Sequence, residues 1–87
     1  MIKKQLMKKS EAWILVFLAS ADSIHKYRMY MATKSGTDYG YVGRILLQLQ
    51  AKHWIKRVRS LHKTKVFYEL TQLGNEQVGL AKKKLMS

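Results

Sequence analysis

The side chains best suited to specific recognition lie between residues 39 and 48. Arg44 and Gln48 stand one helical turn apart, and both residue types form paired hydrogen bonds with purine edges in the major groove of DNA. Gly40 and Gly43 add almost no bulk nearby, so backbone amides at a helix N-terminus could approach a phosphate closely. The predicted nucleic-acid contacts of this helix are Tyr39, Gly40, Tyr41, Gly43, Arg44 and Gln48. Close helix packing would also explain the glycines, and the tyrosines could instead fill the core.

A basic ribbon follows this helix. It places five lysines and arginines within the ten residues 56–65. A run of charge is usually a solvated face, but a cationic hairpin directly after a recognition-type helix is a more specific signal for phosphate binding. The predicted contacts of the ribbon are Lys56, Arg57, Arg59, His62, Lys63 and Lys65.

The whole chain carries the same charge bias. Its 87 residues contain 17 lysines and arginines against five acids, a formal net charge of +12. So large an imbalance in a short chain predicts a polyanionic partner, with double-stranded DNA as the leading candidate. A membrane surface is the usual competitor, but the longest apolar run, residues 12–19, is far shorter than the roughly 20 residues that span a bilayer. No membrane association is expected.

Residue types that would support catalysis are sparse. There is no cysteine, and His25, His53 and His62 share no metal-ligand spacing, so no metal site is predicted. The five acids are scattered singly, which argues against paired carboxylates for acid–base catalysis. Serines and threonines occur in no nucleophile-elbow or phosphate-loop context. We expect a non-enzymatic, cytoplasmic, nucleoid-associated protein that needs no cofactor.

The first predicted element is a helix from Ser10, its N-cap, to about Ala21, preceded by a basic arm over residues 1–9. Residues 13–18 are apolar on all sides, whereas a surface helix shows one apolar stripe. In so small a domain, a second copy of the chain is the economical way to cover the outer side. The alternative is a central helix wrapped by the chain's own elements. The predicted dimer interface consists of Trp13, Ile14, Phe17 and Leu18 together with Val78, Ala81 and Leu85.

Two further helices should position the recognition residues. The second is predicted over residues 24–34 with Ser23 as its cap, and its core face consists of Ile24, Tyr27 and Met31. Gly36 should end it, because glycine readily adopts the left-handed backbone of a tight turn.

The third helix is predicted to follow Thr37 or Asp38 as its cap and to stop near His53. Its core stripe repeats at i, i+3, i+4 and i+7 and consists of Val42, Ile45, Leu46 and Leu49. The opposite face carries Gly40, Arg44, Leu47 and Ala51. Leu47 is an anomaly there: it could contact a thymine methyl group, pack on the ribbon or join a subunit contact.

Residues 55–59 and 66–70 are rich in β-branched and aromatic side chains and predict the two strands of the ribbon. Val66, Tyr68 and Leu70 share one face of the second strand and are expected in the core. Thr71 should cap a last helix over residues 72–86.

Three segments carry a family resemblance: MATKSGTDYGYVGRIL (31–46), AKHWIKRV (51–58) and YELTQLG (68–74). They resemble the turn and recognition helix, the passage into the wing, and the strand-to-last-helix junction of small bacterial and archaeal winged helix-turn-helix regulators of the multiple-antibiotic-resistance and arsenic-repressor types. The resemblance implies an α+β, mostly helical fold over residues 10–87, with three helices, a two-stranded β-wing and a C-terminal helix. His53 departs from the family pattern, in which glycine commonly ends the recognition helix.

This resemblance implies a homodimer that places two third helices in successive major grooves of a roughly palindromic site and thereby represses or activates transcription. Arg44 and Gln48 would read bases, and the ribbon would bind phosphate or the minor groove. The chain lacks the extra helices or cysteines that would sense a ligand or metal, so no small-molecule effector is expected. Other uses of the fold stay open: a plasmid or viral partition or architectural DNA-binding protein, a winged-helix protein–protein interaction module, or an RNA-binding winged helix.

Overall fold

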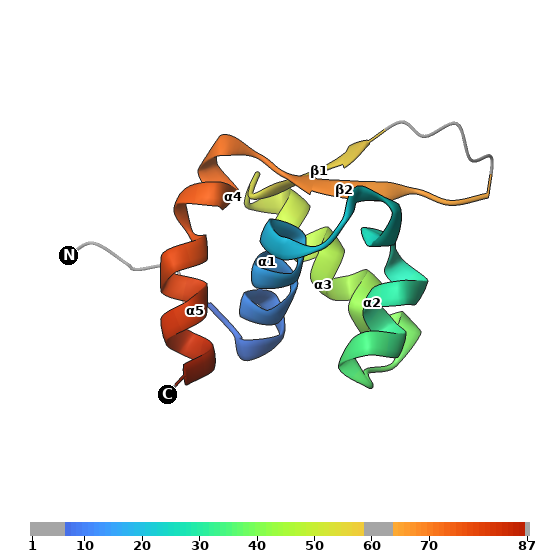
Figure 1. Ribbon diagram of the computed structural model, residues 1–87, viewed down its shortest axis with the longest axis horizontal. Coiled ribbons are helices and arrows are strands. Elements are labelled where there is room, and N and C mark those ends of the chain that lie inside the picture. The colour runs from blue at the N-terminus through green and yellow to red at the C-terminus, as the bar shows by residue number, and fades with distance from the viewer. Residues whose placement is uncertain (1–6, 59–63, 87) are drawn as a thin grey trace.

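The computed structural model describes residues 7–58 and 64–86 of the chain. In chain order it contains α1 (Lys9–Ser20), the short 3-10 helix η1 (Ser23–His25), α2 (Arg28–Ser35), α3 (Tyr39–Ala51), β1 (Ile55–Val58), β2 (Phe67–Leu70), α4 (Gln72–Glu76) and α5 (Val78–Met86) (Figure 1). The predicted mostly helical α+β fold with a two-stranded wing is confirmed. Residues 1–6 of the predicted basic arm, and the predicted contacts Arg59, His62 and Lys63, lie outside the described residues.

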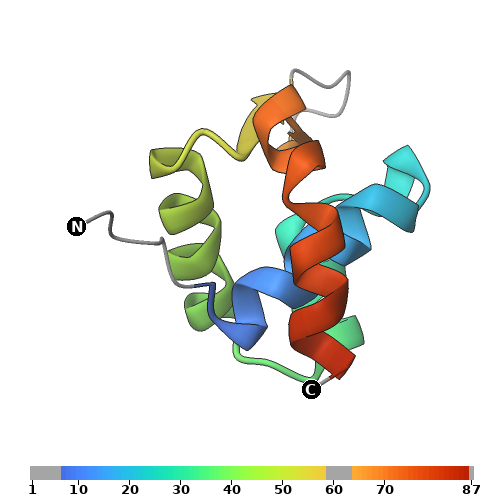
Figure 2. The same ribbon diagram turned by 90° about the vertical axis from the view of Figure 1, so that its left-hand side faces the viewer.

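Helix α1 lies between α5 on one side and the α2–α3 pair on the other (Figure 1, Figure 2). Its residues Ala12, Leu15 and Leu18 are buried in the core. Trp13 and Phe17 are only half-buried, and their rings stack with centroids 5.2 Å apart. The chain itself therefore covers much of the apolar surface of α1, as the wrapped-helix alternative predicts.

The start of α1 is joined to the end of α3 by an ion pair whose carboxylate is buried and whose lysine is partly exposed. The backbone N–H of Lys8 donates to Glu11 Oε1 at 2.9 Å, so Lys8 precedes the helix and the prediction that Ser10 is the N-cap is wrong. Ser10 lies inside the helix, with its hydroxyl 3.2 Å from the Tyr41 hydroxyl. Glu11 is only 1% exposed, and Lys52 Nζ donates to its Oε2 at 2.9 Å and to its Oε1 at 3.1 Å. The buried carboxylate is thus paired and hydrogen-bonded, as burial of a charge requires.

The second helix begins at Arg28, four residues later than predicted. The backbone of Lys26 and Tyr27 is used elsewhere: Tyr27 forms an isolated antiparallel bridge with Phe67, and the Tyr68 N–H donates to the Lys26 carbonyl at 2.9 Å. Residues pairing with a strand cannot also form a helical turn. The prediction that Ile24 faces the core is wrong, because its side chain is 69% exposed. Met31 is buried as predicted.

The turn between α2 and α3 follows its sequence signals. Gly36 has φ +67°, in the left-handed region, which costs glycine little. Asp38 is the cap of α3, its carboxylate accepting a hydrogen bond from the Tyr41 N–H at 3.2 Å. The predicted core stripe Val42, Ile45, Leu46 and Leu49 is buried. The recognition-type helix is therefore fixed on the core through one face and leaves the other free.

Helix α3 ends at Ala51, and His53 then takes φ +62°, the conformation that glycine would adopt at this point. The Trp54 N–H donates to the Leu49 carbonyl at 3.0 Å, which closes the helix end. Non-glycine residues occupy this backbone region uncommonly. The turn directs Trp54 and Ile55 into the core, where both are buried.

The wing is an antiparallel pair in which Ile55 lies opposite Leu70 and Arg57 lies opposite Tyr68. Tyr68 and Leu70 pack against the core as predicted. Val66 does not, because it precedes the first paired residue of β2 and is 39% exposed. Its predicted core position is wrong.

The single last helix predicted over residues 72–86 is divided into α4 and α5 at Gln77. Thr71 caps α4 as predicted, its side chain accepting from the Gly74 N–H at 3.0 Å. A Cβ at Gly74 would collide with the Trp54 carbonyl oxygen, so only glycine lets α4 lie this close to the chain entering β1. After the break, α5 packs along α1 with Ala81 buried.

Candidate nucleic-acid interface

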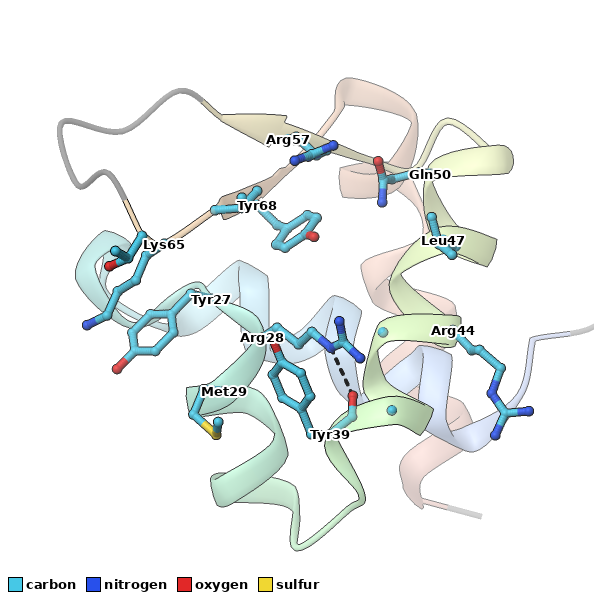
Figure 3. Close-up of a pocket in the computed structure, with 14 residues that line it drawn as sticks. Tyr27, Arg28, Met29, Tyr39, Arg44, Leu47, Gln50, Arg57, Lys65 and Tyr68 are labelled. Carbon is cyan, nitrogen blue, oxygen red and sulfur yellow. Dashed lines mark hydrogen bonds between the residues drawn. The ribbon is translucent and has the colours of Figure 1, made fainter.

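A cleft of about 750 Å³ lies between α3, the start of α2 and the wing (Figure 3). Helices α2 and α3 supply one side and residues around the wing strands supply the other. Its lining consists of Tyr27, Arg28, Met29, Tyr39, Gly40, Gly43, Arg44, Leu47, Gln50, Arg57, Thr64, Lys65, Val66 and Tyr68. We refer to this surface as the cationic cleft.

Four cations line the cationic cleft: Arg28, Arg44, Arg57 and Lys65. Among the described residues that line it, none is acidic. Lys65 Nζ lies 4.3 Å from the centroid of the Tyr27 ring, so this charge is held against an aromatic face. A concave surface with charge of one sign raises the local concentration of a polyanion.

Arg28 lines the cationic cleft although it is not among the contacts predicted from the sequence. Its Nε–H donates to the Tyr39 carbonyl at 2.9 Å, and its guanidinium carbon lies 3.7 Å from the centroid of the Tyr39 ring (Figure 3). A Cβ at Gly43 would collide with the same guanidinium. Arg28 therefore occupies the space that Gly43 leaves, and it fixes the N-terminal turn of α3 to α2. The signal in the sequence that could have identified Arg28 is Gly43, a glycine inside an otherwise regular helix.

Arg44, the predicted base reader, is exposed at the edge of the cationic cleft. Its guanidinium carbon lies 5.8 Å from the centroid of the Tyr41 ring, and the side chain points away from Arg28 (Figure 3). Tyr39 is exposed in the first turn of the same helix. The predicted contacts Tyr39, Gly40, Gly43 and Arg44 are thus brought together on one surface.

Three predicted contacts are not brought into the cationic cleft: Tyr41, Gln48 and Lys56. Tyr41 and Gln48 lie on the flank of α3 and are half-buried, and Tyr41 packs against the core. Gln50 lines the cleft instead, although its side-chain amide also donates to the Leu46 carbonyl at 3.2 Å. Lys56 belongs to the other face of β1 because successive side chains of a strand alternate, and its Nζ lies 3.9 Å from Glu69 Oε1.

The predicted dimer residues differ in how far the single chain covers them. Ile14, Leu18 and Ala81 are buried within one chain. Trp13, Phe17 and Val78 are half-buried, and Leu85 is exposed. Leu80 and Met86 of α5, which were not predicted, are also exposed.

Neither a metal site nor a membrane-spanning segment is found in the part of the chain that the structure describes. Residues 7–58 and 64–86 contain no group of three histidine, cysteine or acidic side chains that could hold a metal ion. None of the helices formed by these residues has the length and apolar character needed to cross a bilayer.

No family model and no curated protein matches this sequence, but solved structures do. A mutant of S. aureus MepR is 18% identical over 88% of this chain and 57% of that one, with a TM-score of 0.79. A second S. aureus MepR mutant, bound to an oligodeoxyribonucleotide, is 17% identical over 85% and 54%, with a TM-score of 0.76. Lactococcus lactis ZitR in complex with DNA is 24% identical over 97% and 54%, with a TM-score of 0.72.

This likeness shows the fold, which is the winged helix expected from the sequence resemblance. The chain spans just over half the length of the structures it matches.

Proposed function

We propose that this protein binds double-stranded DNA sequence-specifically and regulates transcription as a homodimer on the nucleoid. The observation that carries the proposal is the cationic cleft beside the exposed face of α3. Four cations and no acid line it among the described residues, and the chain has a formal net charge of +12. Two proteins of the same fold, MepR and ZitR, have been solved with DNA bound.

The exposed face of α3 fits the role of a groove-reading helix. B-DNA has a major groove about 12 Å wide, which admits one α-helix. Arg44 would read a base edge at the edge of the cationic cleft, and Gly40 in the first turn would let the backbone approach. Arg57 and Lys65, with Arg59, His62 and Lys63 of the ribbon, would bind phosphates or the minor groove.

Homodimer formation is supported by apolar side chains that a single chain leaves uncovered along α1 and α5. Trp13 and Phe17 stack on α1 and remain half-buried, and Leu80 and Leu85 are exposed on α5. A second copy of the chain would remove these surfaces from water. Two copies would then present two α3 helices to successive major grooves.

The experiment that tests the proposal is selection of bound sequences from a random duplex DNA library, followed by affinity measurements over a range of salt. We expect an inverted repeat with half-sites about 10 base pairs apart. The logarithm of the binding constant should fall linearly with the logarithm of the salt concentration, with a slope near −0.9 for each phosphate contacted. Enrichment of direct repeats would contradict a dimeric regulator and favour a partition or filament-forming DNA-binding protein. Absence of any enriched sequence would contradict sequence-specific regulation and favour an architectural protein or a protein-binding module.

Two neighbouring residues of β1 provide a matched pair of variants. Arg57→Gln removes a charge from the cationic cleft, so it should weaken binding to all duplexes alike and reduce the salt slope by about one. Lys56→Gln removes the same charge from the opposite face of the wing and should leave the salt slope nearly unchanged. Equal effects of the two substitutions on the salt slope would show that DNA does not enter the cleft.

A further inference from the structure

The exposed face of α3 carries Gly40, Arg44, Leu47 and Ala51. Beyond Arg44 this face is apolar, and Leu47 is the only large apolar side chain among these four. Leu47 is 66% exposed and lies on the cleft side of α3 (Figure 3). Its exposure argues against close packing on the described strands of the wing, one of the explanations left open by the sequence.

Leu47 is not an isolated exposed leucine. Nine large apolar side chains are exposed within residues 7–58 and 64–86, and four of them line the cationic cleft. These four are Met29, Tyr39, Leu47 and Val66. Single exposed apolar residues are normal on protein surfaces, but here they gather between cations.

The cations around Leu47 determine which kind of partner can cover its side chain. Arg28 fills the space over Gly43, one turn before Leu47, and Arg57 lines the opposite wall. A purely apolar partner would leave these charges desolvated and unpaired, which is costly. A duplex satisfies both, since its phosphates neutralise the cations and its major groove carries one apolar group, the C5 methyl of thymine.

We propose that Leu47 is a specificity-determining residue that selects thymine through contact with its C5 methyl group. The inference rests on the proposed function and adds the chemistry of one base. Each bound half-site should contain a thymine opposite the middle of α3, flanked by positions that Arg44 and the first turn of α3 contact. Leu47 is 66% exposed, so the methyl group can reach its side chain.

The test uses the full chain and the duplex enriched by the library selection, synthesised with uracil in place of thymine at one position at a time. Uracil pairs like thymine and lacks only the methyl. We expect about a fourfold loss of affinity at one position in each half-site, the loss that corresponds to one buried methyl group. No other thymine of the duplex should show a loss that depends on Leu47.

The Leu47→Ala variant distinguishes a direct contact from an effect on DNA shape. This variant should bind the thymine and uracil duplexes equally, with affinity close to that of the unaltered protein for the uracil duplex. Leu73→Ala, at an exposed leucine of α4 outside the cationic cleft, should keep the fourfold preference. Because Leu47 is exposed, its truncation should not affect folding, which the melting temperature of the variant checks.

The two proposals fail in different ways. If a sequence is selected but uracil substitution has no effect, or has the same effect in Leu47→Ala, the assignment of Leu47 is overturned while sequence-specific binding stands. If no sequence is selected, the proposed function is overturned and the thymine contact with it.

Discussion

The two ends of α3 each hold a cation against an aromatic ring, but within the described residues only the cation at the C-terminal end also pairs with a carboxylate. At the C-terminal end, Lys52 Nζ lies 2.9 Å from Oε2 of the buried Glu11. At the N-terminal end, Arg28 lies 3.7 Å from the centroid of the Tyr39 ring and donates to the Tyr39 carbonyl. Within the described chain, no carboxylate pairs with Arg28. One cation is neutralised for stability, whereas the other is fixed in position with its charge retained.

The difference matches the two surroundings. Lys52 joins α3 to α1 through Glu11, whose buried carboxylate would be costly to leave unpaired. Arg28 stands in the cationic cleft, where a carboxylate partner would compete with the phosphates of a polyanion. An aromatic face and a carbonyl restrict the arginine without supplying a counter-charge. Four substitutions test the two ends of α3: two change the cation contacts, and two change the backbone near the C-terminal end.

Gly74→Ala should have the largest effect, at the C-terminal end. The added Cβ would collide with the Trp54 carbonyl, so α4 must shift, and we expect a loss of about 3 kcal/mol in the free energy of unfolding. Gly79→Ala is the control, because nothing lies within 4 Å of its Cβ, and it should stabilise α5 by up to about 1 kcal/mol. Denaturant titration measures both. Equal effects would contradict the close approach at Trp54.

Glu11→Ala should break the ion pair at the C-terminal end. Lys52 would lose a partner at 2.9 Å, and we expect a destabilisation of about 2–3 kcal/mol in denaturant unfolding. Glu76→Ala removes the same charge from an exposed position and should change stability by less than about 0.5 kcal/mol. DNA affinity of the folded Glu11→Ala protein should stay unchanged. A change of about tenfold in that affinity, roughly 1.4 kcal/mol, would contradict the claim that the ion pair of Glu11 and Lys52 contributes only to stability.

Arg28→Lys tests the N-terminal end and keeps the charge. Lysine lacks the planar group that stacks on Tyr39 and donates to its carbonyl, so we expect roughly tenfold weaker DNA binding, about 1.4 kcal/mol. Arg57→Lys is the matched control, since a phosphate contact needs mainly a point charge, and its affinity should change by less than about threefold. If both variants bind alike, Arg28 contributes only charge.

His53→Gly should have the smallest effect and the opposite sign. His53 has φ +62°, a region that costs non-glycine residues about 1–2 kcal/mol. Glycine removes that cost but gains entropy in the unfolded chain, so a net stabilisation of about 0.5–1 kcal/mol is expected from the melting temperature. His53→Ala cannot relieve the backbone and should not stabilise. A stabilisation by alanine would point to the imidazole instead of the backbone.

Local signals in the sequence were sufficient for the elements whose determinants are close together. The buried stripe of α3 from Val42 to Leu49, the turn at Gly36 and the caps Asp38 and Thr71 depend on residues within one or two turns. The wing followed from β-branched residues beside a charged turn. These features fix the fold class because periodicity and capping act over short distances.

The features that were missed depend on distant partners. The late start of α2 is set by the bridge from Tyr27 to Phe67, and the change of cap from Ser10 to Lys8 follows the burial of Glu11 by Lys52. The position of Arg28 in the cationic cleft depends on the space left by Gly43, which lies in the next helix of the chain. Such pairings leave no periodic trace in a single sequence.

The isolated bridge between Tyr27 and Phe67 also bears on how the protein opens. Glu11 and Lys52 are 41 residues apart, and the bridge closes a loop of similar length that contains α2 and α3. The α2–α3 turn and the wing hairpin are local and should form early in folding, whereas these two closures form late. Once both are made, the segment that contains α3 is tied to the rest of the fold, so the backbone amides of α3 should exchange with solvent only when the whole domain unfolds.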